Sequence, residues 1–329
     1  MRLLIAYPDA AQWSWSSPDA ATCCGYSAEA IEAALTKDTE VLVTDALPRN
    51  LDKCDGIKWV HLLSAGYNQA IAHPLTTRTG MRVSNSAGIC AGHMAEFVVG
   101  QMLRHVKRFD AMGQLHQQRE WPDRAAFSRP ALRGRRALIV GYGGVGRETA
   151  RLLRALGVAV DVVQRTTEVE SYAGYLPHPD MGDPKGVLPG RRFTLETMAA
   201  ALADADFVIL TIPLSPRTQH LINRETLAAV KPGAVIINVA RGGLIDLAAL
   251  GEALLAGRVA HAYLDVFEKE PLTRDDPVWA MAGVTVTPHI SGVMPDAMRW
   301  HEDLLRQNIH RYQSGDSLLN EINPAHLAA

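Results

Sequence analysis

The sequence predicts an α/β protein with two doubly wound parallel-sheet domains, one of which is inserted into the other. Apolar, strand-like runs alternate with helical runs over residues 1–85 and again from Arg136 onward, a pattern typical of parallel strands joined by crossover helices. A glycine-rich turn opens the second series near the middle of the 329-residue chain, and a helical run at 295–312 follows that series. We therefore expect a discontinuous first domain, residues 1–88 and 290–329, around an inserted domain of residues 89–289.

The composition is that of a soluble globular protein with enough residues for two domains. Hydrophobic residues make up 47% of the chain and charged residues 21%, both ordinary values. The formal net charge of −2 gives no electrostatic footprint for nucleic acid, and no apolar run approaches the roughly 18 residues of a membrane span. The four cysteines show no metal-ligand spacing, so we expect reduced thiols, no metal site and a cytoplasmic protein; they are Cys23, Cys24, Cys54 and Cys90.

Elements of the first domain follow from short apolar runs and from helical periodicity. Strands are expected at residues 3–7, 41–45 and 59–63, the first being too short for the core of a signal peptide. Residues 27–35 have helical periodicity, with Ser27 as a possible N-cap. A long helical stretch, from about residue 91 to 117, leads to a break at Trp121-Pro122.

The second series contains six expected strands, which match a complete doubly wound unit. They lie at 136–140, 158–163, 207–211, 234–239, 261–265 and 284–287. A helical run, 147–156, follows the first of them. The segment 172–192 carries four prolines and four glycines with little periodicity, and is expected to be a loop.

The glycine-rich turn has the pattern G-x-G-x-x-G between a strand and a helix. In that context the first glycine permits a sharp turn, the second lets the backbone approach a pyrophosphate, and the third lets the helix pack on the strand. The N–H groups and dipole of the helix start favour phosphates. The turn therefore predicts a dinucleotide site that includes Gly141, Gly143, Gly144, Val145 and Gly146.

Three further clusters follow expected strands, at 238–243, 265–272 and 287–292. Ligands of open α/β sheets bind at the carboxyl ends of the strands, so each cluster offers one reactive side chain there: Arg241, Glu270 and His289. Singly, each is more often structural. Together they form a consistent set, because a guanidinium binds a carboxylate, a histidine transfers a proton near neutral pH, and a carboxylate orients that histidine.

The chain resembles the D-isomer-specific 2-hydroxyacid dehydrogenases, the family of glyoxylate/hydroxypyruvate reductases and phosphoglycerate dehydrogenases. The resemblance extends over nearly the whole chain. It is carried by Ser64-Ala65-Gly66, by residues 85–96, by the glycine turn and by the three clusters. It implies a Rossmann nucleotide domain inserted into a flavodoxin-like substrate domain, and reduction of a small 2-oxo acid to the D-2-hydroxy acid with NAD(P)H.

The resemblance also implies roles for individual residues. Arg241 would bind the substrate carboxylate and carbonyl, His289 would be the acid/base, and Glu270 would be its partner. The substrate would also contact the loop Ser64, Ala65, Gly66. Besides the glycine turn, the implied cofactor-binding residues are Gln164, Arg165, Thr166, Ile212, Pro213, Thr218, Val239, Ala240, Arg241, Asp265, His289, Ser291 and Gly292.

At the tip of the second strand the chain departs from the family pattern, because Gln164 stands where NAD-using members usually have Asp. Asp161 lies three residues earlier and is expected on the opposite face of the strand. A carboxylate accepts the ribose 2′-hydroxyl but repels a 2′-phosphate, whereas arginine and hydroxyls suit the phosphate. Arg165-Thr166-Thr167 therefore predicts a preference for NADP(H) over NAD(H).

Alternatives stay open for the function. A dinucleotide-sensing co-repressor could retain the same three residues, and an NAD-dependent phosphoglycerate dehydrogenase is a second possibility. Formate dehydrogenase is discounted because that relative has Gln where this chain has Glu270. We expect a homodimer formed through the inserted domain, since the 91–117 stretch and its extension to about Arg129 look too extended to pack only on their own subunit. No nucleic acid or membrane partner is expected.

Overall fold

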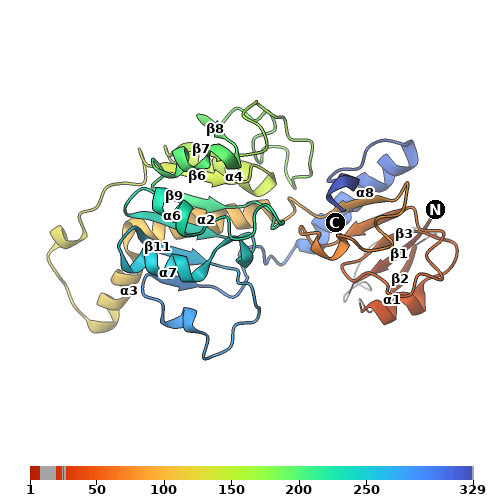
Figure 1. The fold of residues 1–329 in the computed structure, drawn as a ribbon, viewed down its shortest axis with the longest axis horizontal. Coiled ribbons are helices and arrows are strands. Elements are labelled where there is room, and N and C mark those ends of the chain that lie inside the picture. The colour runs from red at the N-terminus through yellow and green to blue at the C-terminus, as the bar shows by residue number, and fades with distance from the viewer. Residues whose placement is uncertain (8–19, 24, 26, 328–329) are drawn as a thin grey trace. The chain divides into compact units, whose positions relative to one another are not determined.

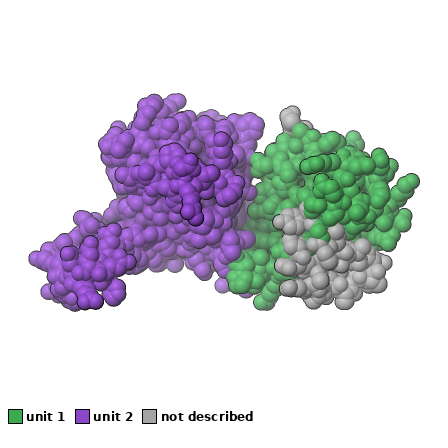
Figure 2. Space-filling model, turned by 90° about the horizontal axis from the view of Figure 1, so that it is seen from below, with its two compact units in different colours: residues 1–89, 173–177, 294–329 green, residues 90–172, 178–293 purple. Residues whose placement is uncertain are grey.

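The computed structural model describes residues 1–7, 20–23, 25 and 27–327. The chain divides into two compact units (Figure 2). Unit 1 holds residues 1–89, 173–177 and 294–329, and unit 2 holds residues 90–172 and 178–293. These units differ from the expected domains at residue 89, at 290–293 and at 173–177. Residues 290 and 291 stay with unit 2 because their backbone N–H groups donate to the carboxylate of Asp265.

Unit 1 is built on a five-stranded parallel sheet with the order β2-β1-β3-β4-β5 (Figure 1). This is the flavodoxin-like order, so the predicted fold class is confirmed for this unit. The strands are β1 (Arg2–Ala6), β2 (Ala20–Cys23), β3 (Thr39–Val43), β4 (Trp59–Leu62) and β5 (Arg82–Asn85). The sequence predicted β1, β3 and β4 but missed β2 and β5, whose four-residue runs AATC and RVSN lack an apolar pattern.

Two helices of unit 1 contribute to apolar clusters formed by alternating strand residues. Ile31 of α1 (Ala28–Ala34) packs with Leu4 and Val60, and Leu305 of α8 (Ala297–Ser314) packs with Trp59. The predicted N-cap of α1 is confirmed, since the Ser27 hydroxyl accepts a hydrogen bond from the N–H of Ala30 at 3.2 Å. The expected helix at 295–312 is confirmed as α8, displaced by two residues.

Unit 2 contains a seven-stranded parallel sheet with the order β12-β11-β10-β9-β6-β7-β8. Counted from the glycine turn, this is the 3-2-1-4-5-6 order of dinucleotide-binding folds with a seventh strand added. The strands are β6 (Arg136–Val140), β7 (Ala159–Val163), β8 (Arg191–Phe193), β9 (Phe207–Leu210), β10 (Ala234–Asn238), β11 (Val259–Leu264) and β12 (Val284–Val286). All six predicted strands are present.

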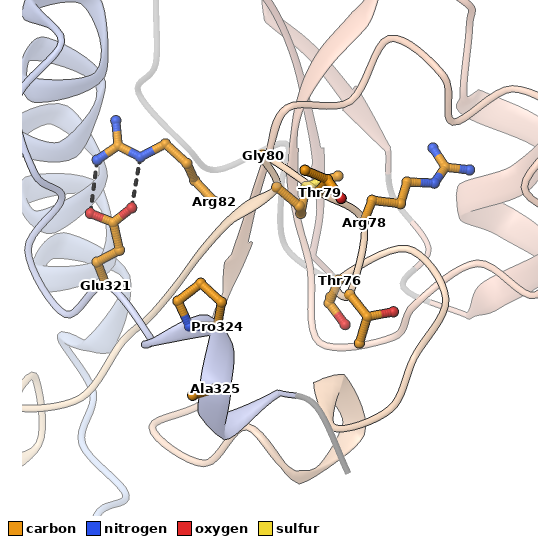
Figure 3. Close-up of a pocket in the computed structure, with 10 residues that line it drawn as sticks. Thr76, Arg78, Thr79, Gly80, Arg82, Glu321, Pro324 and Ala325 are labelled. Atoms are coloured by element: carbon orange, nitrogen blue, oxygen red, sulfur yellow. Dashed lines mark hydrogen bonds and ion pairs between the residues drawn. The ribbon is translucent and has the colours of Figure 1, made fainter.

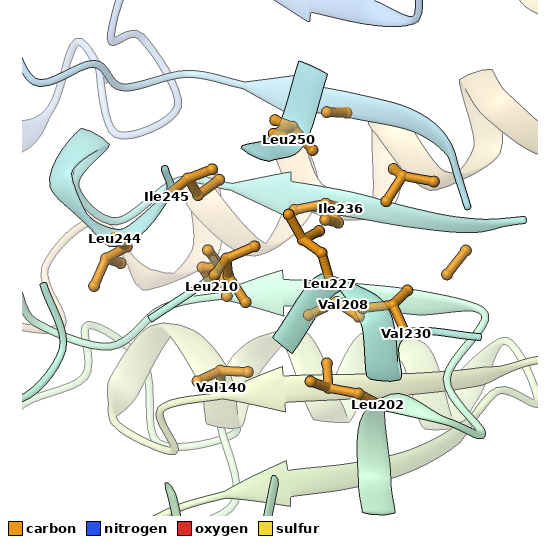
Figure 4. Close-up of a cluster of buried hydrophobic side chains, with 14 of the residues drawn as sticks. Val140, Leu202, Val208, Leu210, Leu227, Val230, Ile236, Leu244, Ile245 and Leu250 are labelled. Carbon is orange, nitrogen blue, oxygen red and sulfur yellow. The ribbon is translucent and has the colours of Figure 1, made fainter. Parts of the chain in front are cut away.

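The two faces of this sheet carry separate apolar clusters because side chains alternate along each strand. One face packs against α2 (Ala91–Lys107) and α4 (Gly144–Ala155), and the other against α5 (Met198–Leu202), α6 (Arg224–Ala229) and α7 (Leu247–Leu255). Figure 4 shows the second cluster, in which strand and helix residues interdigitate; they include Val140, Leu202, Val208, Leu210, Leu227, Ile236 and Leu250.

Two predictions for unit 2 need correction. The expected loop at 172–192 ends in strand β8, which was missed because its sequence, RRF, is short and mostly charged. The helical run expected from residue 147 begins earlier, at Gly144. The expected helical stretch at 91–117 is present as two helices, α2 and α3 (Phe109–Gln118), which are separated because Arg108 adopts a left-handed conformation with φ +57°.

Short 3-10 helices complete the described fold. They are η2 (Asn68–Ala70), η3 (Arg124–Phe127), η4 (Leu195–Thr197), η5 (Gly242–Leu244), η6 (Pro277–Ala280) and η7 (Pro324–His326). Of the predicted thiols, Cys54 and Cys90 are not in a disulfide. Cys24 and the side chain of Cys23 lie outside the described residues.

Candidate active site

The glycine turn connects β6 to α4 as the sequence predicts. Gly141 has φ +102°, and a side chain there would lie 2.7 Å from the backbone of Ile212, so the turn requires glycine. Gly143 is the N-cap of α4, and no other atom would lie within 4 Å of a Cβ at this position. A phosphate can therefore approach the backbone at the start of α4, where N–H groups and the helix dipole favour an anion. The residues present fit a dinucleotide.

Arg147, directly after the turn, anchors the long loop that precedes β8. Its buried guanidinium donates to the carbonyls of Tyr142 at 3.0 Å, Asp183 at 2.6 Å and Glu170 at 2.8 Å. It also lies over the rings of Tyr142 and Tyr172, at 4.5 and 5.3 Å from their centroids. Burial lowers the pKa of Arg147. The loop is thereby fixed against the glycine turn.

Asp183 supplies the other half of this anchor. Its buried carboxylate accepts hydrogen bonds from the Tyr142 hydroxyl at 2.7 Å and from the N–H groups of Val187 and Leu188 at 3.0 and 2.8 Å. Sequence reasoning missed both Arg147 and Asp183. The available signal was Arg147's place after the motif, which nothing in the sequence connected to a residue 36 positions later.

At the tip of β7, Gln164 and Thr166 bind within their own loop. Gln164 Nε2 donates to the carbonyl of Glu168 at 2.7 Å, and the Thr166 hydroxyl donates to the Glu170 carboxylate at 3.3 Å. Arg165 is exposed and has no hydrogen-bond or ion-pair partner within residues 27–327. Asp161 is 1% exposed and paired with two arginines, Arg136 at 2.8 Å and Arg191 at 2.7 Å, so its carboxylate is already engaged.

Five other predicted cofactor residues lie in the loops that follow β9 and β10. Ile212 and Pro213 begin the loop after β9, and the Thr218 hydroxyl closes this loop by donating to the carbonyl of Pro213 at 2.8 Å. Thr218 is buried, so its side chain serves the shape of the loop. Val239 and Ala240, directly after β10, are also buried.

His289 and Glu270 are brought together by the ends of β12 and β11. His289 Nδ1 lies 2.7 Å from Glu270 Oε2, and these side chains are 50% and 33% exposed. The second carboxylate oxygen of Glu270 accepts a hydrogen bond from the N–H of Phe267 at 2.8 Å. Since an ionised carboxylate only accepts hydrogen bonds, Nδ1 is the donor. Nε2 is therefore the atom left for proton transfer.

Asp265 organises the loop that carries His289. Its 1%-exposed carboxylate accepts hydrogen bonds from the Thr287 hydroxyl at 2.6 Å and from the N–H groups of Ile290 and Ser291 at 3.0 and 2.9 Å. The N–H of His289 donates to the carbonyl of Asp265 at 2.9 Å. Asp265, predicted as a cofactor contact, thus has its oxygens committed to the loop. Gly292 follows directly and is partly buried.

Arg241 follows β10 on the neighbouring loop. A side chain at the next residue, Gly242, would lie 1.9 Å from the backbone carbon of Phe267, so glycine permits the two loops to meet. Arg241 Nη1 donates to the carbonyl of Ala240 at 2.6 Å. Burial lowers the pKa of Arg241, and the Glu270 carboxylate opposes that change. The three predicted catalytic side chains therefore belong to one unit and to adjacent strand ends.

The predicted substrate loop, Ser64 to Gly66, belongs to unit 1 and follows β4. Its carbonyl groups are held: those of Ser64 and Ala65 accept from the Ser86 N–H at 3.2 Å and the Asn85 side chain at 2.7 Å, and that of Gly66 accepts from the Ser64 hydroxyl at 2.8 Å. Among the described residues, nothing accepts a hydrogen bond from the N–H groups of Ala65 and Gly66. Two adjacent donors are thus available to an anion.

Figure 3 shows a cavity of about 640 Å³ elsewhere in unit 1, lined by residues 76–82 and by Glu321, Pro324 and Ala325. Arg82 donates to both carboxylate oxygens of Glu321 at 2.7 and 2.8 Å, so the charges there are already paired. The predicted site residues do not line it, and we assign it no role.

Among the described residues, no group of three or more His, Cys, Asp or Glu side chains could hold a metal ion. No described helix has the length and apolarity to span a membrane.

The chain is similar in sequence to proteins of one enzyme family. Residues 99–291 match the family model described as D-isomer specific 2-hydroxyacid dehydrogenase, NAD binding domain. A glyoxylate reductase of Thermofilum pendens is 31% identical over 282 residues, which cover 84% of this chain and 78% of that protein. The D-3-phosphoglycerate dehydrogenase of Methanocaldococcus jannaschii is 29% identical over 299 residues, and the match covers 87% of this chain but only 52% of that longer protein.

A solved structure supports the same assignment. It is a D-isomer specific 2-hydroxyacid dehydrogenase from Xanthobacter autotrophicus Py2, in complex with NADPH and MES. It is 27% identical, has a TM-score of 0.78, and the match covers 98% of both chains. The predicted family is confirmed by a model that matches more than half of the chain and by a relative above 30% identity. The chain belongs to the NAD(P)-dependent D-isomer-specific 2-hydroxyacid dehydrogenase family.

Proposed function

We propose that this protein reduces a small 2-oxo acid of the glyoxylate or hydroxypyruvate type to the D-2-hydroxy acid. The observation that carries the proposal is the 2.7 Å contact between His289 and Glu270 beside Arg241. It combines an acid/base, its carboxylate partner and an anion-binding guanidinium, which are the groups that this chemistry requires.

The residues divide the reaction between them. A bound reduced nicotinamide supplies hydride to the α-carbon of the substrate. Arg241 polarises the carbonyl oxygen, and protonated His289 donates a proton from Nε2 to the alkoxide that develops there. Glu270 stabilises the imidazolium through Nδ1 and keeps Nε2 directed away from itself. Asp265 fixes the loop so that His289 is pre-oriented.

Substrate binding is proposed to use both kinds of anion donor. In unit 2, the Arg241 guanidinium offers a carboxylate a fork of hydrogen bonds. In unit 1, the N–H groups of Ala65 and Gly66 are the proposed anion donors. These groups lack partners among the described residues, so an incoming carboxylate displaces only water from them. Small residues suit this loop because its backbone N–H groups, rather than its side chains, bind the anion.

The cofactor is proposed to be NADP(H) in preference to NAD(H), bound by the glycine turn and by the tip of β7. Gln164 replaces a carboxylate at the tip, and Arg165 is exposed and without a partner within residues 27–327. The Xanthobacter relative contains NADPH. The Glu170 carboxylate beside Thr166 works against the phosphate, so the preference is expected to be moderate.

A homodimer formed through unit 2 is proposed as well. None of the residues in α3 and η3 is buried, and this arm exposes large apolar side chains: Phe109 at 51%, Met112 at 43% and Trp121 at 94%. Exposed apolar groups gathered on one segment are typical of an interface. Light scattering should give twice the monomer mass, whereas an active monomer in dilute solution would contradict this part of the proposal.

The experiment that tests the function is a substrate panel with NADPH and with NADH. Glyoxylate, hydroxypyruvate, pyruvate and bulkier 2-oxo acids are offered as oxidants, and 3-phosphoglycerate as the reductant of NAD⁺ and NADP⁺. Turnover of the small 2-oxo acids supports the proposal. Turnover of 3-phosphoglycerate alone would favour the activity named for the Methanocaldococcus relative, and tight dinucleotide binding without turnover would favour a dinucleotide-sensing binding protein.

A further inference from the structure

We propose that Ser86, held between His61 and His301, is a positioning residue that sets the substrate loop of unit 1. This inference rests on the proposed function, because it concerns how the loop at 64–66 presents its N–H groups to a 2-oxo acid. The sequence singled out residues 85–96 as part of the family resemblance without a role for Ser86 or for the two histidines. All the residues involved lie in unit 1.

Ser86 contacts the loop through its backbone N–H, which donates to the carbonyl of Ser64 at 3.2 Å. Its hydroxyl donates to the carbonyl of Leu62 at 3.1 Å, at the end of β4 and two residues before the loop. The side chain of Asn85 donates to the carbonyl of Ala65 at 2.7 Å. The last residue of β5 and the residue after it therefore hold the carbonyls of Leu62, Ser64 and Ala65. Because each peptide group is planar, fixing the carbonyls of Ser64 and Ala65 fixes the N–H groups of Ala65 and Gly66.

The Ser86 hydroxyl is in turn held by two buried histidines. His61 Nε2 lies 3.2 Å from it and His301 Nδ1, on α8, lies 3.0 Å from it. His61 is 0% exposed and His301 7% exposed. A hydroxyl has one proton to donate and two lone pairs to accept with. The geometry satisfies all three when the hydroxyl donates to Leu62 and accepts from both histidines.

Trp59 fixes the direction of this chain of hydrogen bonds. Its indole N–H can only donate, and it donates to the Ser84 hydroxyl at 2.8 Å. The Ser84 hydroxyl lies 2.8 Å from His61 Nδ1, which is the acceptor available for its proton among the described residues. His61 therefore carries its proton on Nε2 and donates to Ser86. The proton of Ser86 is left for the carbonyl of Leu62.

Burial keeps both histidines in the neutral form that this order needs. It lowers the pKa of His61 to about 3, with the charge of His301 as a lesser cause, and lowers the pKa of His301 to about 4. A neutral His61 has one N–H, so it cannot donate to both serines. The hydrogen bonds therefore run in one order, from Trp59 to Ser84, from Ser84 to His61, from His61 to Ser86, and from Ser86 to Leu62.

The test compares Ser86→Ala with Thr76→Val as a matched control. Both residues are buried hydroxyl residues of unit 1, but the Thr76 hydroxyl donates to the carbonyl of Ala70 at 2.6 Å and lies outside this chain of hydrogen bonds. Ser86→Ala should raise the KM for glyoxylate or hydroxypyruvate roughly tenfold to hundredfold, with an unchanged Kd for NADPH. It should weaken binding of oxamate, an unreactive 2-oxo acid analogue, by a similar factor in calorimetry. Thr76→Val should change the KM by less than about threefold at a comparable loss of Tm.

Each outcome decides the matter. Equal KM values for the two variants, or unchanged oxamate binding in Ser86→Ala, would overturn the inference while leaving the proposed function intact. A parent protein that neither reduces 2-oxo acids nor binds oxamate would overturn the proposed function itself. Should Ser86→Ala fail to fold, Ser86→Cys retains the volume with a weaker hydrogen-bonding group and should raise the KM in the same direction; an unchanged KM in that variant counts against the inference.

Discussion

His289 is held from two sides by residues that follow β11: its ring nitrogen Nδ1 lies 2.7 Å from Oε2 of Glu270, and its backbone N–H donates to the carbonyl of Asp265 at 2.9 Å. The first contact orients the imidazole and the second places its backbone, which has φ +54°. A side chain held in this way keeps one nitrogen free in a fixed direction. Pre-orientation of this kind is what general acid catalysis requires.

Replacing His289 should remove the proton donor without removing the cofactor site. His289→Asn is expected to lower kcat for 2-oxo acid reduction by about 10²–10⁴-fold, with little change in the Kd for NADPH, and asparagine tolerates the positive φ. His220→Asn is the matched control, because His220 also has positive φ and lies 2.7 Å from a glutamate, Glu268, in the same unit. A His289→Asn variant with parental kcat at every pH would contradict the assignment.

Replacing Glu270 should remove the group that orients His289. Glu270→Gln retains the size of the side chain but loses the charge of the carboxylate that lies 2.7 Å from His289 Nδ1, so kcat for 2-oxo acid reduction should fall while the Kd for NADPH stays near the parental value. The measurements are kcat and KM for glyoxylate and the Kd for NADPH in parent and variant. A parental kcat in Glu270→Gln would show that the 2.7 Å contact has no part in the proton transfer.

Arg241→Lys should both raise the KM for 2-oxo acids and lower kcat. A lysine ammonium is a point charge and cannot hold a carboxylate and a carbonyl together as a planar fork does. Arg258→Lys, a change at an exposed arginine of the same unit, serves as the control. Parental kinetics in Arg241→Lys would reduce Arg241 to a structural residue.

The two buried histidines of unit 1 predict a loss of stability in acid. Burial lowers the pKa of His61 to about 3 and of His301 to about 4, whereas an unfolded histidine titrates near 6.5. Below pH 6.5 the unfolded chain therefore binds more protons than the folded one, and the free energy of unfolding falls as the pH drops toward 4. Each histidine should contribute a loss on the order of 2 kcal/mol between pH 8 and pH 5.

Thermal unfolding at pH 8 and pH 5 measures this effect. His301→Leu should have a smaller decrease of Tm between the two pH values than the parent. His310→Leu, an exposed position on the same helix α8, should retain the parental decrease. A parent whose Tm is equal at pH 8 and pH 5 would show that the buried histidines do not contribute in this way.

Local patterns made much of the fold and of the candidate site predictable. The apolar run at 136–140 coincides with β6, and the three candidate catalytic residues could be proposed because each lies in a cluster after a strand. The anchor of Arg147 on Asp183 was not predictable, because it joins residues 36 positions apart through a backbone carbonyl, which leaves no pattern in the sequence. The same holds for Ser86, whose role depends on His301, 215 positions away. Strand β8 was missed because its pairing with β7, rather than its own residues, makes it a strand.

The proposed preference for NADP(H) is favoured by Arg165 at the tip of β7 and opposed by Glu170. Arg165 is exposed and lacks a partner within residues 27–327, so its guanidinium is available to a 2′-phosphate, and such a charge-assisted contact contributes roughly 1.5–3 kcal/mol. Arg165→Ala should therefore lower kcat/KM for NADPH on the order of 10- to 100-fold and leave NADH nearly unchanged.

Glu170→Gln should act in the opposite direction. Its carboxylate accepts a hydrogen bond from Thr166 at 3.3 Å, and a negative charge at this tip repels the phosphate. Glutamine retains an acceptor for Thr166 without that charge, so kcat/KM for NADPH should rise and that for NADH should stay constant. Arg154→Ala, an exposed change at the far end of α4, should affect the two cofactors equally. A parent that prefers NADH, or an Arg165→Ala variant that loses both cofactors equally, would mean that the tip of β7 does not read the 2′-phosphate.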